Sequence, residues 1–470
     1  MTPADYEALR SQYDVIPLVR ELSADTLTPL VAFAALSPDG AEAFLFESVE
    51  RGENVGRYSF VGFEPRRNLR IGRDAADPVE TLHRELVPLR VYGEDKLPPF
   101  FGGAVGYFGY GVNRWTERIP DTLRDDYGIP DAKLLFFDNV VVFDHVRQQL
   151  YVVANIFTKD GSLEDGERRL DFAVERLRRA TLEPIAFPDA PLAQFTSTHT
   201  RAEFEQMIRD AKEEIVAGEI FQIVLSQRWE TDYPTADALT LYRTLRSINP
   251  SPYMFLLRTN ECTLVGASPE MLVRVTGRHA ETRPIAGTRP RGATREEDLE
   301  HERSLLADPK ENAEHLMLVD LGRNDIGRIC RSGSVEVTDF SHVERYSHVM
   351  HLVTDVAGEL RDDRTPVDAF LSCFPAGTVS GAPKIRAMEL IDRFEATRRG
   401  PYAGAVAYFG FSGNLDSCIT IRTVTLVNDK AYVQAGAGIV YDSDPATEFV
   451  ETENKSAALR RAISVAKAVR

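Results

Sequence analysis

The amino-acid sequence predicts an α+β fold. Helical and strand-like segments alternate along the 470 residues, but without the regular strand–helix rhythm that builds a parallel sheet. Short apolar runs rich in β-branched and aromatic residues are frequent in the first part of the chain, as in proteins with many short strands. The length exceeds what one hydrophobic core usually serves, so we expect two sub-structures or one large intertwined one.

Strands dominate a first block, residues 1–183. The runs AFLFES (43–48), LLFFDNVVVF (134–143) and LYVVANIF (150–157) are typical of strands, because β-branched and aromatic side chains fit a pleated surface. A charged helix is expected near residues 163–180, at the end of this block.

A linker at residues 184–198 separates this block from the second, residues 199–470. Its three prolines are Pro184, Pro188 and Pro191. The second block begins with a strong helix start, because Thr200 and Glu203 have the spacing of a capping box. Apolar residues follow at helical spacing, and Gly218 is expected to end this helix.

Two later helix starts carry matching pairs of acids. Asp308-Pro309 and Asp444-Pro445 each have the pattern of an N-cap and a first helical residue, followed by Glu-x-x-Glu. A spacing of three puts both carboxylates of a pair on one helix face, where they could simply complement the helix dipole. Two such pairs facing each other would need a cation, and oxygen ligands without His or Cys favour Mg²⁺. The four acids are Glu311, Glu314, Glu448 and Glu451.

A second group of residues could bind an anion. Gly436 and Gly438 lie in QAGAGIVYDSDP, where glycines let backbone N–H groups approach an anion closely; a tight strand-to-helix connection is the alternative. Arg422 lies within ITIRTVTLV (419–427), predicted as a strand, and a buried guanidinium there needs an anion or a structural salt bridge. Thr378 and further backbone donors lie in the predicted loop FPAGTVSGAPK.

Three histidines lie close together in the sequence: His342, His348 and His351. Such a group could suggest a metal site, but no cysteine pairing or HExxH spacing supports one. His351 lies in a strand-like apolar run, HVMHLV, and is a candidate general acid or base, with simple packing as the alternative.

One internal echo links the two blocks. FGGAVGYFGY (101–110) and YAGAVAYFGF (402–411) align without a gap. The match could arise by chance from strand-and-glycine chemistry, or the two blocks could use related sheets that pack close together.

Composition excludes several classes of protein. With 72 acidic and 55 basic residues the formal charge is −17, which argues against a nucleic-acid-binding protein. The N-terminus lacks the pattern of a signal peptide, and no apolar run reaches the ~18 residues of a membrane helix. The four cysteines form no CxxC pair, which suits the reducing cytoplasm. We therefore expect a soluble cytoplasmic protein. The sequence contains no GxSxG, Walker or kinase motif, so hydrolase and phosphotransferase activities lack support.

The motifs of residues 199–462 resemble those of the chorismate-utilising enzymes and follow in that family's order. They are SPE (268–270), RPIAGTRPRG (283–292), ENAEHLMLVDLGRND (311–325), HVMHLV (348–353), FPAGTVSGAPK (374–384), YAGAV (402–406) and GAGIVYDSDPATEFVETENK (436–455). The first block is similar to that of the aminating large subunits of anthranilate synthases. The resemblance implies a large α/β sandwich of antiparallel sheets flanked by helices, with two intertwined sub-domains, in agreement with the α+β prediction.

The resemblance also implies a substrate site. Glu314 and Glu451 would be the closest carboxylates to a Mg²⁺ ion, with Glu311 and Glu448 ligating directly or through water. The metal would hold the ring carboxylate of chorismate. The enolpyruvyl carboxylate would be held by a second set of groups: Tyr402, Arg422, Gly436, Ala437, Gly438 and Lys455.

Catalytic roles follow from the same resemblance. Glu270 would be the general acid that assists departure of the C4 hydroxyl as ammonia adds at C2. His351 would act in the elimination that releases pyruvate, and Thr378 would line the pocket and contact the substrate.

Two positions separate the activities within the family. Gln222 stands where the salicylate and isochorismate synthases carry a water-activating lysine, and Ala286 stands where typical aminodeoxychorismate synthases carry a nucleophilic lysine. Ammonia as nucleophile and anthranilate as product are therefore favoured. The alternatives are an aminodeoxychorismate synthase, a relative that stops at the aminated intermediate, and a non-catalytic tryptophan-binding regulator.

A partner and an inhibitor are also expected. The chain carries no glutaminase motif, so a separate glutamine amidotransferase subunit should supply ammonia, in a heterotetramer. LFES (45–48) resembles the LLES element for feedback by tryptophan, and NPSPYMF (249–255) resembles its other wall. The residues assigned to the inhibitor are Glu47, Ser48, Asn249, Pro250, Ser251, Pro252, Tyr253 and Met254.

Overall fold

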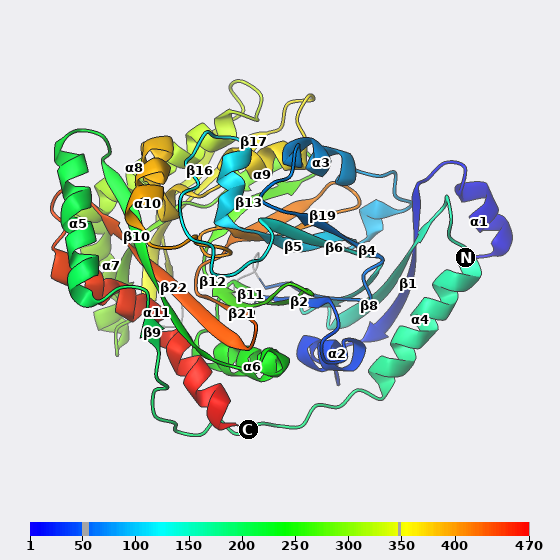
Figure 1. Cartoon of the computed structure of the whole chain (residues 1–470). Coiled ribbons are helices and arrows are strands. Elements are labelled where there is room, and N and C mark those ends of the chain that lie inside the picture. Colours follow the sequence, from blue (N-terminus) through cyan, green and yellow to red (C-terminus); the bar gives the residue numbers. More distant parts are fainter. Residues whose placement is uncertain (49–55, 346–348, 470) are drawn as a thin grey trace.

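Two large antiparallel sheets organise the molecule, and helices lie on their outer faces (Figure 1). The computed structural model describes residues 1–48, 56–345 and 349–469. Within these residues, strands that are neighbours in a sheet run antiparallel, from the outermost pair to the centre. The predicted α+β fold with antiparallel sheets flanked by helices is confirmed.

The sheets differ in size among the described residues. The first has twelve strands, along the path β1 (Val15–Ser23), β8 (Gln149–Phe157), β7 (Asn139–Asp144), β3 (Tyr58–Phe63), β2 (Ala43–Glu47), β11 (Tyr253–Arg258), β12 (Thr263–Ser268), β21 (Thr423–Val427), β22 (Lys430–Ile439), β10 (Gln222–Asp232) and β18 (Gly381–Ala382), with β9 (Thr196–Ser197) paired to β10. The second has ten, along β15 (Ile285–Pro290), β17 (Val349–Glu359), β14 (His279–Thr282), β13 (Met271–Thr276), β20 (Leu415–Ile419), β19 (Ala405–Gly410), β5 (Gly103–Phe108), β6 (Ala132–Phe137) and β4 (Arg67–Ile71), with β16 (Glu336–Arg345) paired to β17.

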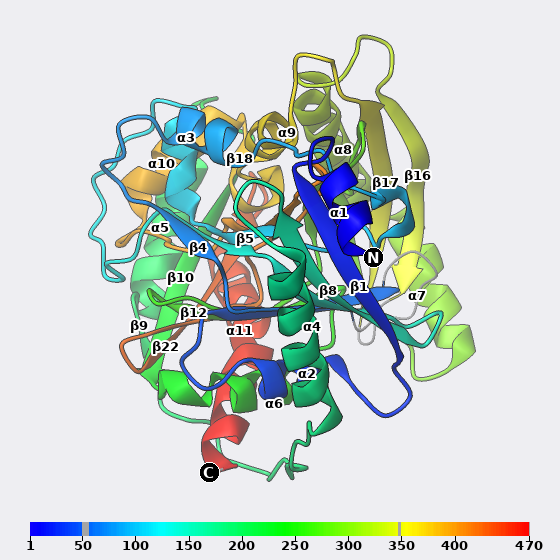
Figure 2. The same ribbon diagram turned by 90° about the vertical axis from the view of Figure 1, so that its right-hand side faces the viewer.

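Helices cover the two sheets on opposite sides. Those on the first sheet are α2 (Pro29–Leu36), α4 (Leu163–Arg178), α6 (Ala238–Ile248) and α11 (Pro445–Ala468). Those on the second are α3 (Pro78–Glu85) and α9 (Pro366–Cys373), whereas α10 (Lys384–Phe394) packs against β10 and β18 at one edge of the first sheet. The others are α1 (Pro3–Leu9), α5 (Arg201–Val216) beside α11, α7 (Arg295–Ala307), and α8 (Pro309–Gly327) against β15 and β17. Figure 2 shows α4 lying across β8 and β1.

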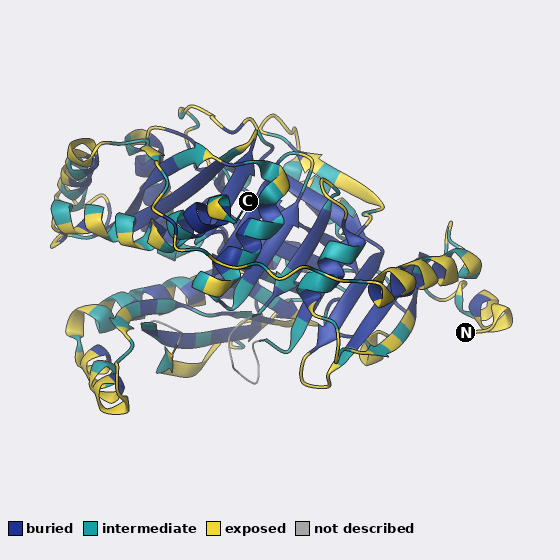
Figure 3. Ribbon diagram, turned by 90° about the horizontal axis from the view of Figure 1, so that it is seen from below, coloured by how far each residue is buried: buried dark blue, intermediate teal, exposed yellow. Residues whose placement is uncertain are grey.

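A continuous apolar core fills the space between the sheets. Phe44 and Phe60 from the first sheet meet Tyr107 and Tyr408 from the second. Figure 3 shows that most strands are buried and that most exposed residues are on the helices and loops, although part of β16 is also exposed. The space between the sheets is therefore closely packed, and this packing holds the strand ends in place.

Both sheets contain strands from both predicted blocks. In the first sheet β2 pairs with β11, so that Glu47 lies opposite Met254. In the second sheet β5 pairs with β19, so the two segments of the internal echo are neighbouring strands of one sheet. Residues 179–195 hold no helix or strand. The division into two blocks, with a linker at residues 184–198, therefore stays a prediction.

The predicted helix starts are confirmed, and one strand prediction is corrected. Thr200 caps α5 with a capping box, and an aspartate caps each of α8 and α11. The run at 134–143 is two strands, because the chain crosses at Asp138 from β6 in the second sheet to β7 in the first. Among the described residues, none of the helices has the length and apolar character needed to cross a membrane.

Candidate active site

The starts of α8 and α11 bring the predicted glutamates to one region. Each helix carries its pair in the first two turns after the capping aspartate. The ammonium groups of Lys310 in α8 and Lys455 in α11 both act to lower the pKa of Glu314 and of Glu448. A lysine of each helix thus lowers the pKa of a glutamate in the other helix, as expected if the two helix starts face each other.

The donor set of this region fits Mg²⁺. Burial raises the pKa of Glu314 and Glu448, and the negative charge of Glu311 and Glu451 raises it further in each case. Gln222 donates from Nε2 to Oε1 of Glu314 at 3.2 Å and opposes the shift. Carboxylates that raise the pKa of a neighbour favour a cation, and Mg²⁺ is typically held by one or two carboxylates together with water and substrate oxygens.

Two basic side chains contact one glutamate of each pair, Glu311 and Glu451. Arg289 donates from Nη1 to Oε1 of Glu311 at 3.2 Å and from Nη2 to Oδ2 of Asp308 at 2.7 Å. Lys455 Nζ lies 2.5 Å from Oε1 of Glu451. Sequence reasoning missed Arg289, although it lies in the motif RPIAGTRPRG, because nothing local indicates contact with a helix about twenty residues further on.

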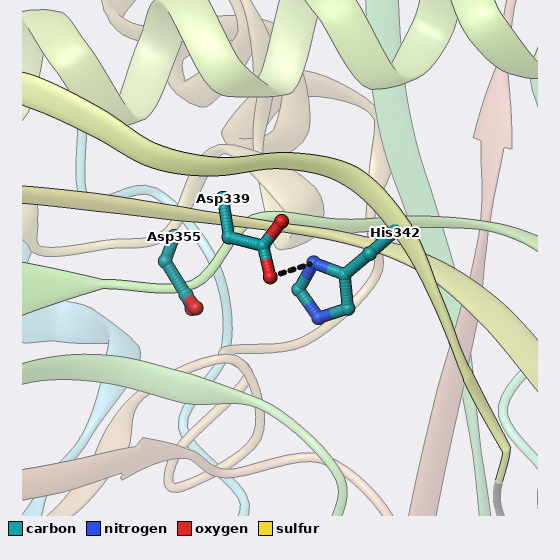
Figure 4. Close-up of side chains that lie close together, drawn as sticks. All are labelled: Asp339, His342 and Asp355. Carbon is teal, nitrogen blue, oxygen red and sulfur yellow. Dashed lines mark ion pairs between the residues drawn. The ribbon is translucent and has the colours of Figure 1, made fainter.

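Among the described residues, one group of three possible metal ligands has its ligand atoms within 4.8 Å of one another. This group does not include any of the four glutamates. It comprises Asp339 and His342 of β16 and Asp355 of β17 (Figure 4). Arg283 donates from Nε to Oδ1 of Asp355 at 2.5 Å and also pairs with Glu344. Because Arg283 neutralises Asp355 and His342 lies 3.3 Å from Asp339, we interpret the group as an ion-pair network. Of the sequence's neighbouring histidines, His348 lies outside the described residues.

The structure corrects the predicted location of Arg422. This residue lies in the connection between β20 and β21, with a φ of 49°, and not within a strand. The reason is topological, because β20 belongs to the second sheet and β21 to the first. Arg422 donates from Nη1 to the carbonyl oxygen of Lys455 at 2.5 Å, and burial lowers its pKa. A half-buried guanidinium without a carboxylate bound to it among the described residues is suited to an anionic ligand.

Close packing around β22 completes this anion-binding side. A Cβ atom at Gly436 would lie 2.9 Å from Oη of Tyr402, and one at Gly438 would lie 2.8 Å from Nε2 of Gln222. Ala437 between them is fully buried. Lys455 donates from Nζ to the carbonyl oxygen of Gly436 at 3.1 Å. The predicted substrate residues are therefore brought together around Lys455.

Glu270 and Thr378 form a hydrogen-bonded pair on another wall of the site. Thr378, in a 3₁₀ turn (Gly377–Val379), donates from Oγ1 to Oε1 of Glu270 at 2.7 Å. Burial raises the pKa of Glu270 to about 7, while the Thr378 hydrogen bond and the charge of Lys455 act to lower it. Glu270 can therefore carry a proton at neutral pH, as a general acid must.

His351 is oriented by the neighbouring strand β15. Its Nδ1 lies 2.8 Å from the carbonyl oxygen of Gly287 and 3.1 Å from Oγ1 of Thr288. Since a carbonyl only accepts, Nδ1 carries the proton and Nε2 keeps its lone pair. Burial lowers the pKa of His351, and the charge of Arg422 lowers it further. The imidazole is thus neutral and suited to act as a base.

A buried ion pair behind the site was not anticipated. Arg399 donates to both carboxylate oxygens of Glu395 and to the carbonyl oxygens of Val379 and Val224. It therefore ties the turn that carries Thr378 to β10, which carries Gln222 at its start. A pair four residues apart in a helix-end sequence is common, so the sequence offers no signal for this role.

A separate cavity of about 350 Å³ lies between the two sheets. Five of the eight residues assigned to an inhibitor line it: Glu47, Ser48, Pro252, Tyr253 and Met254. The other three, Asn249, Pro250 and Ser251, do not. Ser48 Oγ is buried without a hydrogen-bond partner among the described residues, whereas Glu47 accepts hydrogen bonds from Tyr242 at 2.6 Å and Arg246 at 3.0 Å.

Most of the chain is similar to known proteins. The family model described as chorismate binding enzyme matches residues 41–461. The anthranilate synthase component 1 of Acetivibrio thermocellus is 44% identical over 493 aligned positions, which cover 99% of each chain. That of Mycolicibacterium smegmatis is 44% identical over 489 positions, covering 98% of this chain and 93% of the other.

Solved structures agree with the fold. Anthranilate synthase component I from Streptococcus pneumoniae superposes with a TM-score of 0.78 at 37% identity, over 93% of this chain and 99% of the other. The isochorismate synthase MenF from Escherichia coli superposes with a TM-score of 0.73, over 98% of each chain. At 20% identity the MenF match shows the fold alone.

Proposed function

Because this chain belongs to the family of chorismate-binding enzymes, we propose that it is the aminating large subunit of an anthranilate synthase. In that reaction chorismate and ammonia give anthranilate, pyruvate and water. The observation that carries the proposal is the pairing of a protonatable Glu270 with a neutral His351 in one site, in a chain similar throughout to anthranilate synthases.

Two sets of groups would hold the two carboxylates of chorismate. Glu314 and Glu451, with Glu311 and Glu448 around them, would hold a Mg²⁺ ion, which supplies positive charge for the ring carboxylate. Arg422, Lys455 and Tyr402 would hold the enolpyruvyl carboxylate, together with the backbone of residues 436–438. The arrangement of Arg422 and Lys455 around Gly436 supports this division.

The chemistry then needs two proton transfers. Glu270 donates a proton to the C4 hydroxyl as it leaves and ammonia adds at C2, which is why a pKa of about 7 suits it. His351 takes a proton through Nε2 in the elimination that releases pyruvate and makes the ring aromatic. Gln222 supports ammonia as nucleophile, because an amide cannot remove a proton from water at neutral pH.

A partner and a regulator are part of the proposal. A glutamine amidotransferase subunit would deliver ammonia, and the chain alone would use free ammonia. Tryptophan would bind in the cavity between the sheets. Its volume of about 350 Å³ and the hydroxyl of Ser48, which has no hydrogen-bond partner in the described part of the chain, support a small polar ligand. Four buried free cysteines support the cytoplasm as the compartment.

One assay tests the activity. The purified chain with chorismate, ammonium and Mg²⁺ should produce fluorescent anthranilate and an equal amount of pyruvate. Aminodeoxychorismate without pyruvate, or no product at all, would contradict the proposal. Gel filtration with an amidotransferase subunit tests the partner, because two proteins that never co-elute do not form the complex.

A further inference from the structure

Glu270 and Arg422 project from the same end of one pair of strands. β13 begins directly after Glu270, and β20 ends three residues before Arg422. The strands are paired, with Met271 opposite Cys418, and the N–H of Ile419 donates to the carbonyl oxygen of Glu270 at 3.0 Å. The positions of a candidate acid and a candidate substrate-binding arginine therefore depend on the register of this strand pair.

The other end of the strand pair lies in the wall of the cavity between the sheets. Arg274 of β13 is opposite Asp416 of β20 and donates from Nε to its Oδ2 at 3.0 Å. Tyr253, from β11 of the facing sheet, donates from Oη to Oδ1 of Asp416 at 3.2 Å and accepts from Nη2 of Arg274 at 3.1 Å. All three side chains line the cavity. The network thus joins the strand pair to the opposite sheet at this point.

A short stretch of backbone separates the two ends. Arg274 follows Glu270 by four residues, which is about 13 Å of strand. The pairing is irregular between Met271 and Val273, and there Ser417 accepts from the N–H of Val273 at 3.2 Å and donates to its carbonyl oxygen at 2.7 Å. Because a packed sheet does not absorb small displacements, a shift of one strand at the cavity would reach its other end.

We propose that the Arg274–Asp416 pair positions Glu270 and Arg422 and transmits occupancy of the inter-sheet cavity to them. A ligand that donates a hydrogen bond to Asp416 competes with Arg274 for that carboxylate and loosens the connection between β13 and β20. Chorismate binding at the far end weakens as a consequence. The inference rests on the proposed binding of tryptophan, and it names Arg274 and Asp416 as positioning residues that act through Glu270 and Arg422.

The test measures the coupling between the two sites at equilibrium. Without ammonia there is no turnover, so calorimetry can measure tryptophan binding to the full chain with and without saturating chorismate and Mg²⁺. In the wild type, chorismate should weaken tryptophan binding by about tenfold, and tryptophan should weaken chorismate binding by the same factor. Arg274→Gln should reduce this factor to less than about twofold.

A second variant keeps the test independent of ligand contacts. Glu281 of β14 accepts from Nη1 of Arg274 at 3.1 Å and does not line the cavity. Glu281→Gln should leave tryptophan affinity unchanged and still reduce the coupling factor. The control is Arg283→Gln, because Arg283 also pairs with two carboxylates of the second sheet but lies outside the β13–β20 pair.

Each outcome decides between the two proposals. If the wild type binds no tryptophan, the proposed regulation fails and this inference falls with it. If the wild type shows coupling and both Arg274→Gln and Glu281→Gln keep the full factor, the strand pair does not transmit and only this inference is overturned. Equal loss of coupling in Arg283→Gln would also overturn it, because the effect would then not be specific to β13 and β20.

Discussion

Thr378 donates its hydroxyl hydrogen to Oε1 of Glu270 across 2.7 Å. This hydrogen bond stabilises the carboxylate and lowers its pKa, but burial is the larger effect and raises the pKa to about 7. Glu270 acts in its protonated form, so turnover should fall as the pH rises through this value. Thr378→Val removes the hydrogen bond, which should raise the pKa and move the alkaline limb of the profile to higher pH.

The measurement is kcat/KM for chorismate against pH. The total ammonium is adjusted so that the concentration of free ammonia is the same at every pH, because otherwise its own titration would hide the limb. Thr420→Val is the matched control, since the buried hydroxyl of Thr420 has no hydrogen-bond partner among the described residues. An alkaline limb that stays in place in Thr378→Val would contradict the role of Glu270.

The second prediction concerns His351. Its imidazole must be neutral to accept a proton, and burial lowers its pKa below the usual 6.5. The acid limb of the pH profile should therefore lie below pH 6.5, with activity lost as the pH falls through the histidine's pKa. His351→Ala should reduce pyruvate release by about a hundredfold or more and let the aminated intermediate accumulate. Chromatography of the products and an enzymatic pyruvate assay check both, and wild-type pyruvate release would rule out the role.

Local sequence patterns were sufficient for the helix starts but not for the contacts between elements. The caps of α8 and α11 are determined within four residues, so Asp308 and Asp444 could be assigned directly. The partner of Glu311 in α8 could not be assigned, because Arg289 reaches it from the strand β15. The prediction that Arg422 lies in a strand was wrong. An alternating apolar run does not reveal that the chain passes from one sheet to the other within that run.

Long-range strand pairing was the other part that the sequence could not supply. The internal echo suggested related sheets, but only the pairing of β5 with β19 makes the two segments neighbours. The cavity between the sheets likewise combines Ser48 near one end of the chain with Asp416 near the other. The cavity residues that we assigned to an inhibitor were recognised from two short motifs, LFES and NPSPYMF. Arg274 and Asp416 belong to neither motif.

The third prediction tests the metal site. Removal of divalent cations with EDTA should abolish turnover, and Mg²⁺ should restore it. Glu314→Gln should weaken Mg²⁺ binding by about tenfold or more, measured by calorimetry as well as by activity. Because the pKa of Glu314 is raised, Mg²⁺ binding should also weaken as the pH falls and this carboxylate takes up a proton. Glu453→Gln, in the same helix as Glu451, is the control and should bind Mg²⁺ like the wild type.

The fourth prediction concerns inhibition by tryptophan. Ser48 Oγ is buried, lines the inter-sheet cavity and has no hydrogen-bond partner among the described residues. A charged group of a bound amino acid would satisfy this hydroxyl, and such a hydrogen bond contributes about 1.5–3 kcal/mol. Ser48→Ala should therefore raise the tryptophan concentration for half-inhibition by about tenfold or more, while ammonia-dependent turnover without tryptophan stays at the wild-type rate.

Ser251→Ala separates a specific contact from a general effect on the fold. Ser251 is also buried and belongs to the second motif, but it does not line the cavity. Its removal should leave inhibition unchanged. If Ser251→Ala and Ser48→Ala weaken inhibition equally, tryptophan binds outside this cavity. If millimolar tryptophan has no effect on the wild type, the chain is not regulated by tryptophan, and the hydroxyl of Ser48 then serves another ligand.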